Sequence, residues 1–419
     1  MQNSKHTRAN KAMLPILLTT FIDQLGFGIV IPVLPALLLD LNSGIFPHEF
    51  GLAGRSILLG LLIAAYPLAQ FIGAPILGSL SDRHGRKKIL LLSLIGTFIG
   101  YAFFGMGILI SNIWILFISR ILDGFTGGNM STIYSSVADI SSDSEKPKRF
   151  GLLGMMQGIG LIAGPIIGGY LSDKSLFHLF HYSGPFWFVA GITVINILMV
   201  IYLFPETLSK KIHAAIDPFT GFKNIVKAYK VKNLRTIFLV SFLISFGLNL
   251  FVQFFSFYLI NKFRMSQSEV GNLLAYVIVW AAISQGVIAG YVSKKVSPAK
   301  IIPIAAVLLA VSIVSLVLPG QYTHMLILLP FVAIFQGLAI PNVTTLISEQ
   351  ATRESQGEVM GINQSVMAVT QIIPPIIDGI LFSMSPDLPM IGAGVCVMLG
   401  WFVFVYYFDK NKKQKFVEI

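Results

Sequence analysis

The sequence has few charged residues and almost no cysteine. Charged residues make up 12% of its 419 residues, whereas an ordinary soluble domain has about 25%. Because 55% of the residues are hydrophobic, water is not the main solvent of this chain. Cys396 is the only cysteine, which excludes an intramolecular disulfide and a metal site built from several cysteines. We expect it to be a small core residue of the last helix.

Motifs for nucleotide and metal chemistry are also missing. No G-x-x-x-x-G-K-[ST] loop occurs in the sequence, so we expect no cofactor and predict that an ion gradient supplies the energy. The seven histidines show no ligand spacing apart from His178 and His181. Metal or catalytic use of this pair is one alternative, and an ordinary external loop is the other. Without a reactive cluster elsewhere, the sequence predicts neither an enzyme nor a metal site.

The apolar residues are gathered into long stretches. Most are about 20 residues long, enough for a helix to cross roughly 30 Å of hydrocarbon. A helix satisfies its own backbone hydrogen bonds in lipid, so the sequence predicts an all-α membrane protein. Pro15, Pro32 and Pro35 are expected to bend or shorten the first span. The twelve predicted spans cover residues 13–39, 55–79, 88–110, 113–135, 148–172, 184–204, 235–260, 269–292, 300–319, 324–348, 357–383 and 388–408.

Lys and Arg are unevenly distributed between the two sets of connecting segments. One set, which includes both termini and residues 78–88, holds most of them, and the other holds only Arg55, Lys174, Lys262 and Arg264. Short loops rich in these residues stay in the cytoplasm, so we predict cytoplasmic termini in the inner or plasma membrane. The net charge of +11 then reflects topology and contact with anionic lipid, and nucleic acid is not an expected partner.

The longest break between spans divides them into six and six. We predict an N-terminal half at 1–204, a cytoplasmic central loop at 205–233 and a C-terminal half at 234–419. An amphipathic helix on the membrane face is expected within the loop, and a solvated linker is the alternative. The apolar positions of this helix are Phe219, Phe222, Ile225, Val226 and Tyr229.

The two halves repeat each other in sequence. Residues 78–88 align with residues 290–300 at a single offset, except that Lys294 takes the place of Asp82. A similar match links residues 164–169 with residues 374–379. Parallel halves of six helices are a known transporter plan, in which the substrate site lies at mid-depth between the halves.

Several segments resemble one family. Residues 78–87, GSLSDRHGRK, match every fixed position of the loop signature of the major facilitator superfamily. Residues 120–128 resemble its span-four signature, and residues 160–169 resemble the span-five signature seen mostly in proton-coupled antiporters. Residues 23–35 are similar to the opening of tetracycline-type exporters in the twelve-helix drug/proton antiporter branch. The resemblance covers nearly the whole chain and implies two pseudo-symmetric six-helix halves.

Ionisable residues inside a membrane span are functional candidates, because burying a charge there is costly. Asp23 lies in a low-dielectric place that favours its protonated form, so we predict that it takes up and releases a proton in each cycle. The alternative is a structural carboxylate that Arg120 neutralises or that caps the helix broken by proline. The resemblance assigns proton transfer to Arg120, while an interfacial anchor or an ion pair with Asp123 competes with that role. Asp378 is predicted to be a second coupling or substrate carboxylate.

The cytoplasmic loop is predicted to act as a conformational latch. The resemblance implies that Asp82 pairs with Arg86 and Asp139 and faces the start of helix eleven near Gly357. Such pairs would favour the outward-open state until a proton or substrate releases them. The positive-inside rule alone would explain Arg83 but not the acid or the glycines. The predicted latch residues are Gly78, Asp82, Arg83, Gly85, Arg86 and Asp139.

Two further sets of residues carry predictions. Small residues in span five should allow close helix packing, and the resemblance implies that this helix seals the path against leak. These are Gly160, Gly164, Pro165 and Gly168. Polar and aromatic residues within the spans are predicted to line the cavity, with ordinary helix packing as the alternative. They are Gln70, Asn249, Gln253, Phe254, Trp280, Gln336, Asn342, Asn363, Gln364 and Gln371.

Together these features predict a secondary transporter that exchanges protons for a small amphipathic organic molecule by alternating access. Its expected partners are the substrate, protons and membrane lipid, and we expect it to act as a monomer. The alternatives are proton-coupled uptake, export of an endogenous metabolite such as a siderophore, and a membrane sensor that has lost transport.

Overall fold

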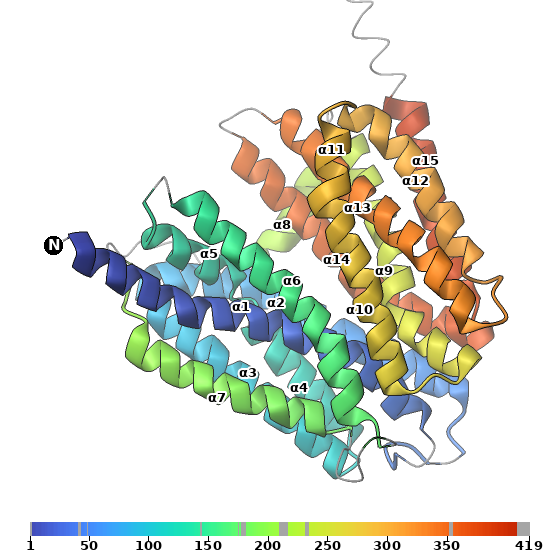
Figure 1. Ribbon diagram of the computed structural model, residues 1–419, viewed down its shortest axis with the longest axis horizontal. Helices are drawn as coiled ribbons and strands as arrows, with labels where there is room; N and C mark the ends of the chain where they lie inside the picture. Colours follow the sequence, from blue (N-terminus) through green and yellow to red (C-terminus); the bar gives the residue numbers. More distant parts are fainter. Residues whose placement is uncertain are drawn as a thin grey trace, which may run out of the picture. The chain divides into compact units, whose positions relative to one another are not determined.

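The computed structural model describes residues 2–40, 43–47, 49–142, 145–174, 176, 182–208, 217–230, 234–351 and 355–408 (Figure 1). Most of these residues are helical, and none of them lies in a β-strand. The helices up to the central loop are α1 (Gln2–Leu39), α2 (Leu52–His84), α3 (Arg86–Leu109), α4 (Ile113–Thr126), α5 (Met130–Asp139), α6 (Lys146–Ser172) and α7 (Gly184–Leu203). Those that follow are α8 (Thr220–Lys230), α9 (Arg235–Phe263), α10 (Gln267–Ile283), α11 (Ala289–Ser293), α12 (Pro298–Ser315), α13 (Met325–Glu349), α14 (Gln356–Met384) and α15 (Leu388–Val403).

Eleven helical segments in the described chain are long and apolar enough to cross a membrane. They coincide with eleven of the twelve predicted spans. The first span is not shortened, because α1 continues through Pro15, Pro32 and Pro35 to Leu39. The eighth span consists of α10 and α11 joined by a π-helical turn, Ser284–Ile288. The hydroxyl of Ser284 in that turn donates a hydrogen bond to the carbonyl of Ile334 on α13.

The predicted fourth span, residues 113–135, is not one helix. It is divided into α4 and α5 by a turn at Gly127, Gly128 and Asn129. Two consecutive glycines weaken a helix, and the side chain of Gln70 donates a hydrogen bond of 3.0 Å to the Gly127 carbonyl. The Gly127 carbonyl, at the point where the helix breaks, therefore accepts a hydrogen bond from α2.

The contacts divide the chain into two compact units. The predicted halves at 1–204 and 234–419, with a central loop at 205–233, stay a prediction. Unit 1 contains residues 1–50, 65–220 and 266–275, and unit 2 contains residues 51–64, 221–265 and 276–419. The first turns of α2 thus pack with unit 2, whereas the first turns of α10 pack with unit 1. Two transmembrane helices therefore each contribute to both units.

In unit 1, α1 packs along α6 and α7, and α3 packs along α4 and α7 (Figure 1). The close contact between α1 and α6 depends on glycine. A Cβ atom at Gly164 would lie 2.6 Å from Gly28 Cα, and one at Gly168 would lie 2.9 Å from Ile29 Cα. The span-five glycines thus lie against the α1 backbone, as close packing requires, while the sealing role of this helix stays a prediction.

In unit 2, α9 packs along α14 and α15, and α12 packs along α13 and α15. Phe254, Phe257 and Phe382 form an aromatic cluster between α9 and α14. Phe254 is fully buried in this cluster, which favours the packing alternative over a cavity lining.

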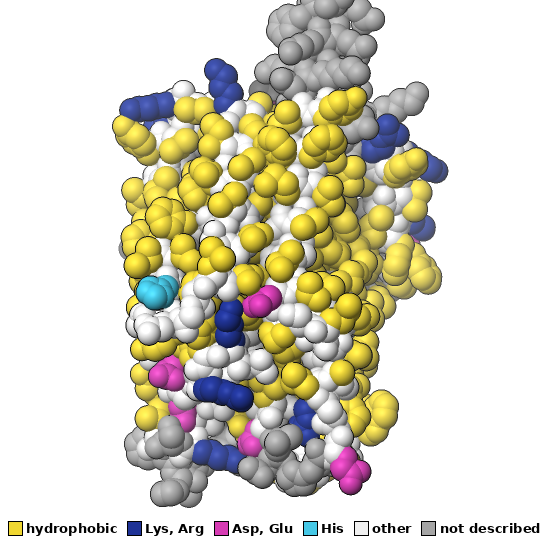
Figure 2. Space-filling model, turned by 90° about the vertical axis from the view of Figure 1, so that its right-hand side faces the viewer, with side chains coloured by type: hydrophobic (Ala, Val, Ile, Leu, Met, Phe, Trp, Pro, Cys, Tyr) yellow, Lys and Arg dark blue, Asp and Glu magenta, His cyan; other side chains and the backbone are white. Residues whose placement is uncertain are grey.

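Hydrophobic side chains cover most of the face shown in Figure 2, and most charged side chains lie toward its two ends. Such a surface suits contact with hydrocarbon. The predicted helix of the central loop is α8, whose side chains of Phe219, Phe222, Val226 and Tyr229 are exposed. Its opposite side is held to α14, where Lys227 Nζ lies 2.7 Å from Glu358 Oε1. The contact of α8 with a membrane stays a prediction.

Candidate functional site

Three of the predicted coupling residues meet inside unit 1. Asp23 lies on α1, and Arg120 and Asp123 lie on α4, where they are 4% and 5% exposed. The two carboxyl groups are close enough to interact electrostatically, and Asn129 lies beside Asp23. Asp23 Oδ2 and Arg120 Nε are buried and have no hydrogen-bond partner among the described residues. The site is therefore a buried group of two acids and one base with unused hydrogen-bonding capacity.

The guanidinium of Arg120 does not form the ion pair that the sequence left open. No nitrogen of Arg120 lies within 4.0 Å of a carboxylate oxygen of Asp23 or Asp123 in the described chain. Instead, Arg120 Cζ lies 4.5 Å from the centre of the Tyr66 ring on α2. A cation over an aromatic face is stabilised by the negative face of the ring. Tyr66 thus holds the guanidinium near both acids while leaving them without a direct salt bridge.

A second tyrosine lies on the other side of Asp123. Tyr101 and Thr97 of α3 are adjacent to the Asp123 carboxyl group. The Tyr101 hydroxyl occupies the space beside Gly26 of α1, so that a Cβ atom there would collide with it. A Cβ atom at Gly100 would lie 2.8 Å from Asp123 Cβ. Gly26 of α1 therefore makes room for the Tyr101 hydroxyl, and Gly100 of α3 makes room for Asp123.

Gly124 of α4 and Gly128 of the turn after it also bring α2 close to this group. A Cβ atom at Gly124 would collide with the Tyr66 carbonyl oxygen, and one at Gly128 would lie 2.6 Å from the Ala74 backbone nitrogen. Gln70, one turn after Tyr66, bonds the Gly127 carbonyl. Gln70 thus fastens α2 to the break between α4 and α5, which favours the packing alternative over a cavity lining.

The predicted latch residues meet at the loop between α2 and α3. Arg86 Nη1 lies 2.5 Å from Asp82 Oδ1, and Arg86 Nε lies 3.4 Å from Asp139 Oδ2 at the end of α5. Arg86 Nη1 also donates a hydrogen bond of 2.6 Å to Ser81 Oγ. Arg86 is 7% exposed, so this arginine is buried among three oxygen acceptors. The release of these pairs during transport stays a prediction.

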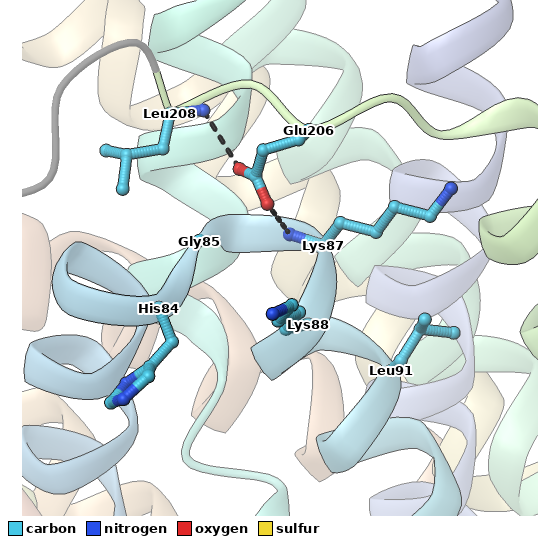
Figure 3. A pocket seen from close by; sticks show the side chains of 7 residues that line it. All are labelled: His84, Gly85, Lys87, Lys88, Leu91, Glu206 and Leu208. Atoms are coloured by element: carbon cyan, nitrogen blue, oxygen red, sulfur yellow. Dashed lines mark hydrogen bonds between the residues drawn. The ribbon is translucent and has the colours of Figure 1, made fainter.

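Glu206 completes this loop from the segment that follows α7 (Figure 3). Its carboxylate accepts hydrogen bonds from the backbone N–H groups of Arg86 and Lys87 at 2.9 and 3.3 Å. These are free donors of the first turn of α3, and a carboxylate is favourable there. Gly85, with φ of 109°, lies against the same carboxylate, and a Cβ atom at this position would collide with it. Glu206 also lines a pocket of about 420 Å³ with His84, Lys87, Lys88, Leu91 and Leu208.

The polar residues predicted to line a cavity in unit 2 fall into two groups. Asn249 Nδ2 donates to Thr370 Oγ1 at 3.3 Å, and Ser241 Oγ donates to Asn363 Oδ1 at 3.1 Å. Asn342 Nδ2 donates to the Leu338 carbonyl at 2.7 Å. Asn249 and Asn363 thus take part in hydrogen bonds between α9 and α14, whereas Asn342 bonds the backbone of its own helix. The other members differ in burial: Gln253 is buried, Trp280, Gln336 and Gln371 are half-buried, and Gln364 is exposed.

The fourth predicted coupling residue, Asp378, belongs to unit 2. It lies on α14 and is fully buried. Its predicted role as a second coupling or substrate carboxylate stays a prediction. The predicted His178 and His181 pair lies outside the described residues.

These observations can be compared with known proteins. A family model described as Major Facilitator Superfamily matches residues 16–373 and 237–418. The chain belongs to the major facilitator superfamily. It is 30% identical over 385 residues to "Tetracycline resistance protein, class C" of Escherichia coli, covering 90% of this chain and 91% of that protein. It is 27% identical over 403 residues to "Multidrug resistance protein 2" of Bacillus subtilis (strain 168), covering 94% and 95%.

The fold is that of the same superfamily. The crystal structure of a D-xylose-proton symporter matches with a TM-score of 0.74 and 16% identity, covering 94% of this chain and 98% of that chain. The predicted all-α fold of this superfamily is confirmed, and the chain is a membrane transporter rather than an enzyme.

Three residues of this superfamily member had no place in the sequence prediction: Tyr66, Tyr101 and Glu206. A sequence signal existed only for the tyrosines, since each is a polar aromatic residue within a predicted span and near glycines. Glu206 lies 120 residues from Arg86 in the chain. Nothing in either segment indicates that they meet.

Proposed function

We propose that this transporter is a proton-coupled antiporter that exports a small amphipathic organic molecule, with Asp23, Arg120 and Asp123 as its coupling site. The observation that carries the proposal is the burial of two acids beside one arginine that forms no ion pair with either. A transporter that runs on a proton gradient needs a group that changes its charge inside the membrane. It needs no further cofactor.

The charge of this group supports proton binding. With both carboxyl groups ionised, the three side chains carry a net charge of −1, and one bound proton makes the group neutral. A net charge in a low-dielectric interior is costly, so the closed site is more stable with one proton. The unprotonated form needs compensation from water or from a polar or cationic group of the substrate. Proton and substrate would therefore stabilise the same site at different points of the cycle.

Tyr66 positions the Arg120 guanidinium for this exchange. Tyr66 holds the guanidinium of Arg120 over its ring, and no ion pair among the described residues fixes it to either acid. Because Arg120 is not locked to one carboxylate, a proton leaving Asp23 can be balanced by a small movement of the guanidinium. A fixed salt bridge would instead hold the acid ionised throughout the cycle.

The relatives support the direction and the substrate class. Resistance to tetracycline and resistance to several drugs are in the names of proteins that this chain resembles over about nine-tenths of its length. We infer export across the inner or plasma membrane, with both termini in the cytoplasm as the Lys and Arg distribution indicates. The proposed transporter acts as a monomer, in contact with lipid, and does not bind nucleic acid.

The test is proton movement in everted membrane vesicles energised by respiration. A panel of tetracyclines, lipophilic cations and cell-extract metabolites is added to wild type and to Asp23→Asn. We expect at least one compound to collapse part of the pH gradient in wild type, and Asp23→Asn to abolish that response because it cannot exchange a proton.

A matched control is Asp387→Asn, which changes an acid that is paired with Lys262 at 3.3 Å and lies outside the coupling site. It should retain the response. If no compound releases protons through folded, inserted wild-type protein, proton-driven export is wrong, and uptake becomes the better candidate. A full response from Asp23→Asn would move the coupling site elsewhere.

A further inference from the structure

Asp378 is an acid without a partner in the interior of unit 2. It is 0% exposed, and neither of its carboxyl oxygens has a hydrogen-bond partner among the described residues. It lies on α14, three residues after Pro375. The Asp23 group contains its own base, whereas Asp378 has none beside it. A different physical explanation is therefore needed for an acid at this position.

The helices around Asp378 offer it no counter-charge within their spans. α14 packs against α9, α13 and α15, and these carry Asp, Glu, Lys or Arg only in their terminal turns. The titratable group near Asp378 on α15 is the thiol of Cys396. On α9, Tyr258 and Lys262 are at the end of the helix, where Lys262 bonds Tyr258 and Asp387.

The first turns of α2 cover α14 directly beside this acid. Ser56 Oγ donates a hydrogen bond of 3.0 Å to the carbonyl of Gly379, the residue after Asp378. A Cβ atom at Gly379 would lie 2.6 Å from the Ser56 carbonyl oxygen, and one at Gly60 would collide with the Pro375 carbonyl. The two backbones are thus in contact over one helical turn. The charged residue of this α2 segment is Arg55, which is buried and engaged in contacts of its own.

Burial without a partner favours the neutral form of the Asp378 carboxyl group. An ionised carboxylate in a low-dielectric interior without hydrogen bonds is strongly disfavoured. The packing seen here therefore suits the neutral acid. The charged form would need water or a cation, and either requires the helices around it to separate. Because Gly379 belongs to the contact with α2, separation of α2 from α14 would uncover the turn that carries Asp378.

We propose that Asp378 is a second proton-binding site, which holds a proton while residues 51–64 of α2 pack on α14 and releases it when that contact opens. The inference rests on the proposed proton-coupled transport and adds a second proton to each cycle. The proton enters the carboxyl group as the contact closes and leaves to water as it opens, so no other reactant is needed. A proton is the only ligand that the closed site could hold, since the acid is fully buried.

The first test measures how steeply transport depends on the pH gradient. Vesicles are clamped at zero membrane potential, and the limiting accumulation of a transported compound is measured at several imposed gradients. Each exchanged proton multiplies accumulation by about tenfold per pH unit. We expect a dependence on two protons in wild type and on one proton in Asp378→Asn, so that the variant accumulates about tenfold less per pH unit while still transporting.

The same experiment separates this inference from the proposed function. No accumulation driven by the gradient in wild type would contradict proton-coupled transport as a whole. Coupled wild type with an unchanged slope in Asp378→Asn would contradict only the second proton. The control is Asp387→Asn, whose slope should equal that of wild type because its acid is in an ion pair.

A second test observes the proton directly. The infrared spectrum of purified protein contains a carbonyl stretching band for each protonated carboxyl group. We expect Asp378→Asn to lack a band that wild type and Asp387→Asn both show at neutral pH. Equal bands in all three proteins would overturn the proposal, whether or not the variant transports.

Discussion

The loop between α2 and α3 can be compared with the loop between α11 and α12, since residues 78–88 align with residues 290–300. In both loops the following helix begins at the same aligned position. α3 begins after Gly85, and α12 begins after Ser297, which aligns with Gly85. The first loop is connected to distant segments. Arg86 contacts Asp139, and Glu206 bonds the first turn of α3.

The contacts of the second loop are with residues close to it in the sequence. Pro298 takes the first position of α12 and has no N–H group there to satisfy. Lys294 stands where the first loop has Asp82, and Lys295 Nζ donates to the nearby Tyr291 hydroxyl at 2.5 Å. Residues that depend on distant partners can respond when those partners move, whereas local contacts cannot. This difference explains why the first loop is the better candidate for a latch.

The largest effect is expected for Arg86→Ala. The change leaves Asp82 and Asp139 facing each other without their shared cation, so we expect a loss of about 3 kcal/mol in the free energy of unfolding. Efflux should fall at least severalfold as the loop loses its pairs. Unfolding in detergent and efflux from cells would measure both. The control is Lys295→Ala in the second loop, which should change stability by less than about 0.5 kcal/mol. Equal effects of the two variants would remove the distinction between the loops.

A smaller effect is expected for Gly85→Ala. Alanine is strained at a φ of 109°, and its Cβ atom would strike the Glu206 carboxylate, so stability should fall by about 2 kcal/mol. Ser297→Ala is the matched change, and its effect should be small because Ser297 makes no capping bond with its side chain. In a Glu206→Ala background, the cost of Gly85→Ala should decrease, since only the strain of φ remains. An unchanged cost would mean that Glu206 does not occupy the space beside Gly85. Chemical unfolding of the four variants would decide this.

The smallest effect is expected at the first residues of the two aligned segments, Gly78 in α2 and Gly290 in α11. A Cβ atom at Gly290 meets nothing within 4 Å, whereas one at Gly78 would lie 2.9 Å from Ser131 Oγ. Gly290→Ala should therefore raise the free energy of unfolding by about 0.5 to 1 kcal/mol through helix propensity alone. Gly78→Ala should gain less, because the Ser131 hydroxyl must move. Thermal unfolding of both variants in detergent is the measurement. A larger gain for Gly78→Ala would contradict the closer packing of the first loop.

The sequence predicted the helices better than it predicted the neighbours of individual side chains. Eleven of the twelve predicted spans correspond to helical segments, and the exception, residues 113–135, breaks where Gln70 bonds Gly127. The Asp82, Arg86 and Asp139 cluster could be expected from a family signature. Tyr66 beneath Arg120 could not, because the signature says nothing about which face of α2 is turned toward α4. The division of α2 and α10 between two units was likewise not expected.

The sequence by itself determined the all-helical membrane fold, the lengths of most spans and the distribution of positive charge around them. These properties are local, since a helix in lipid bonds its own backbone and needs only a long enough run of apolar residues. Only the tertiary structure decided that Arg120 lies over Tyr66 and that Glu206 bonds the start of α3. It also decided that Asp378 is buried without a hydrogen-bond partner among the described residues. Such contacts depend on how helices far apart in the chain are rotated and packed, and the small residues that permit each close approach do not specify its partner.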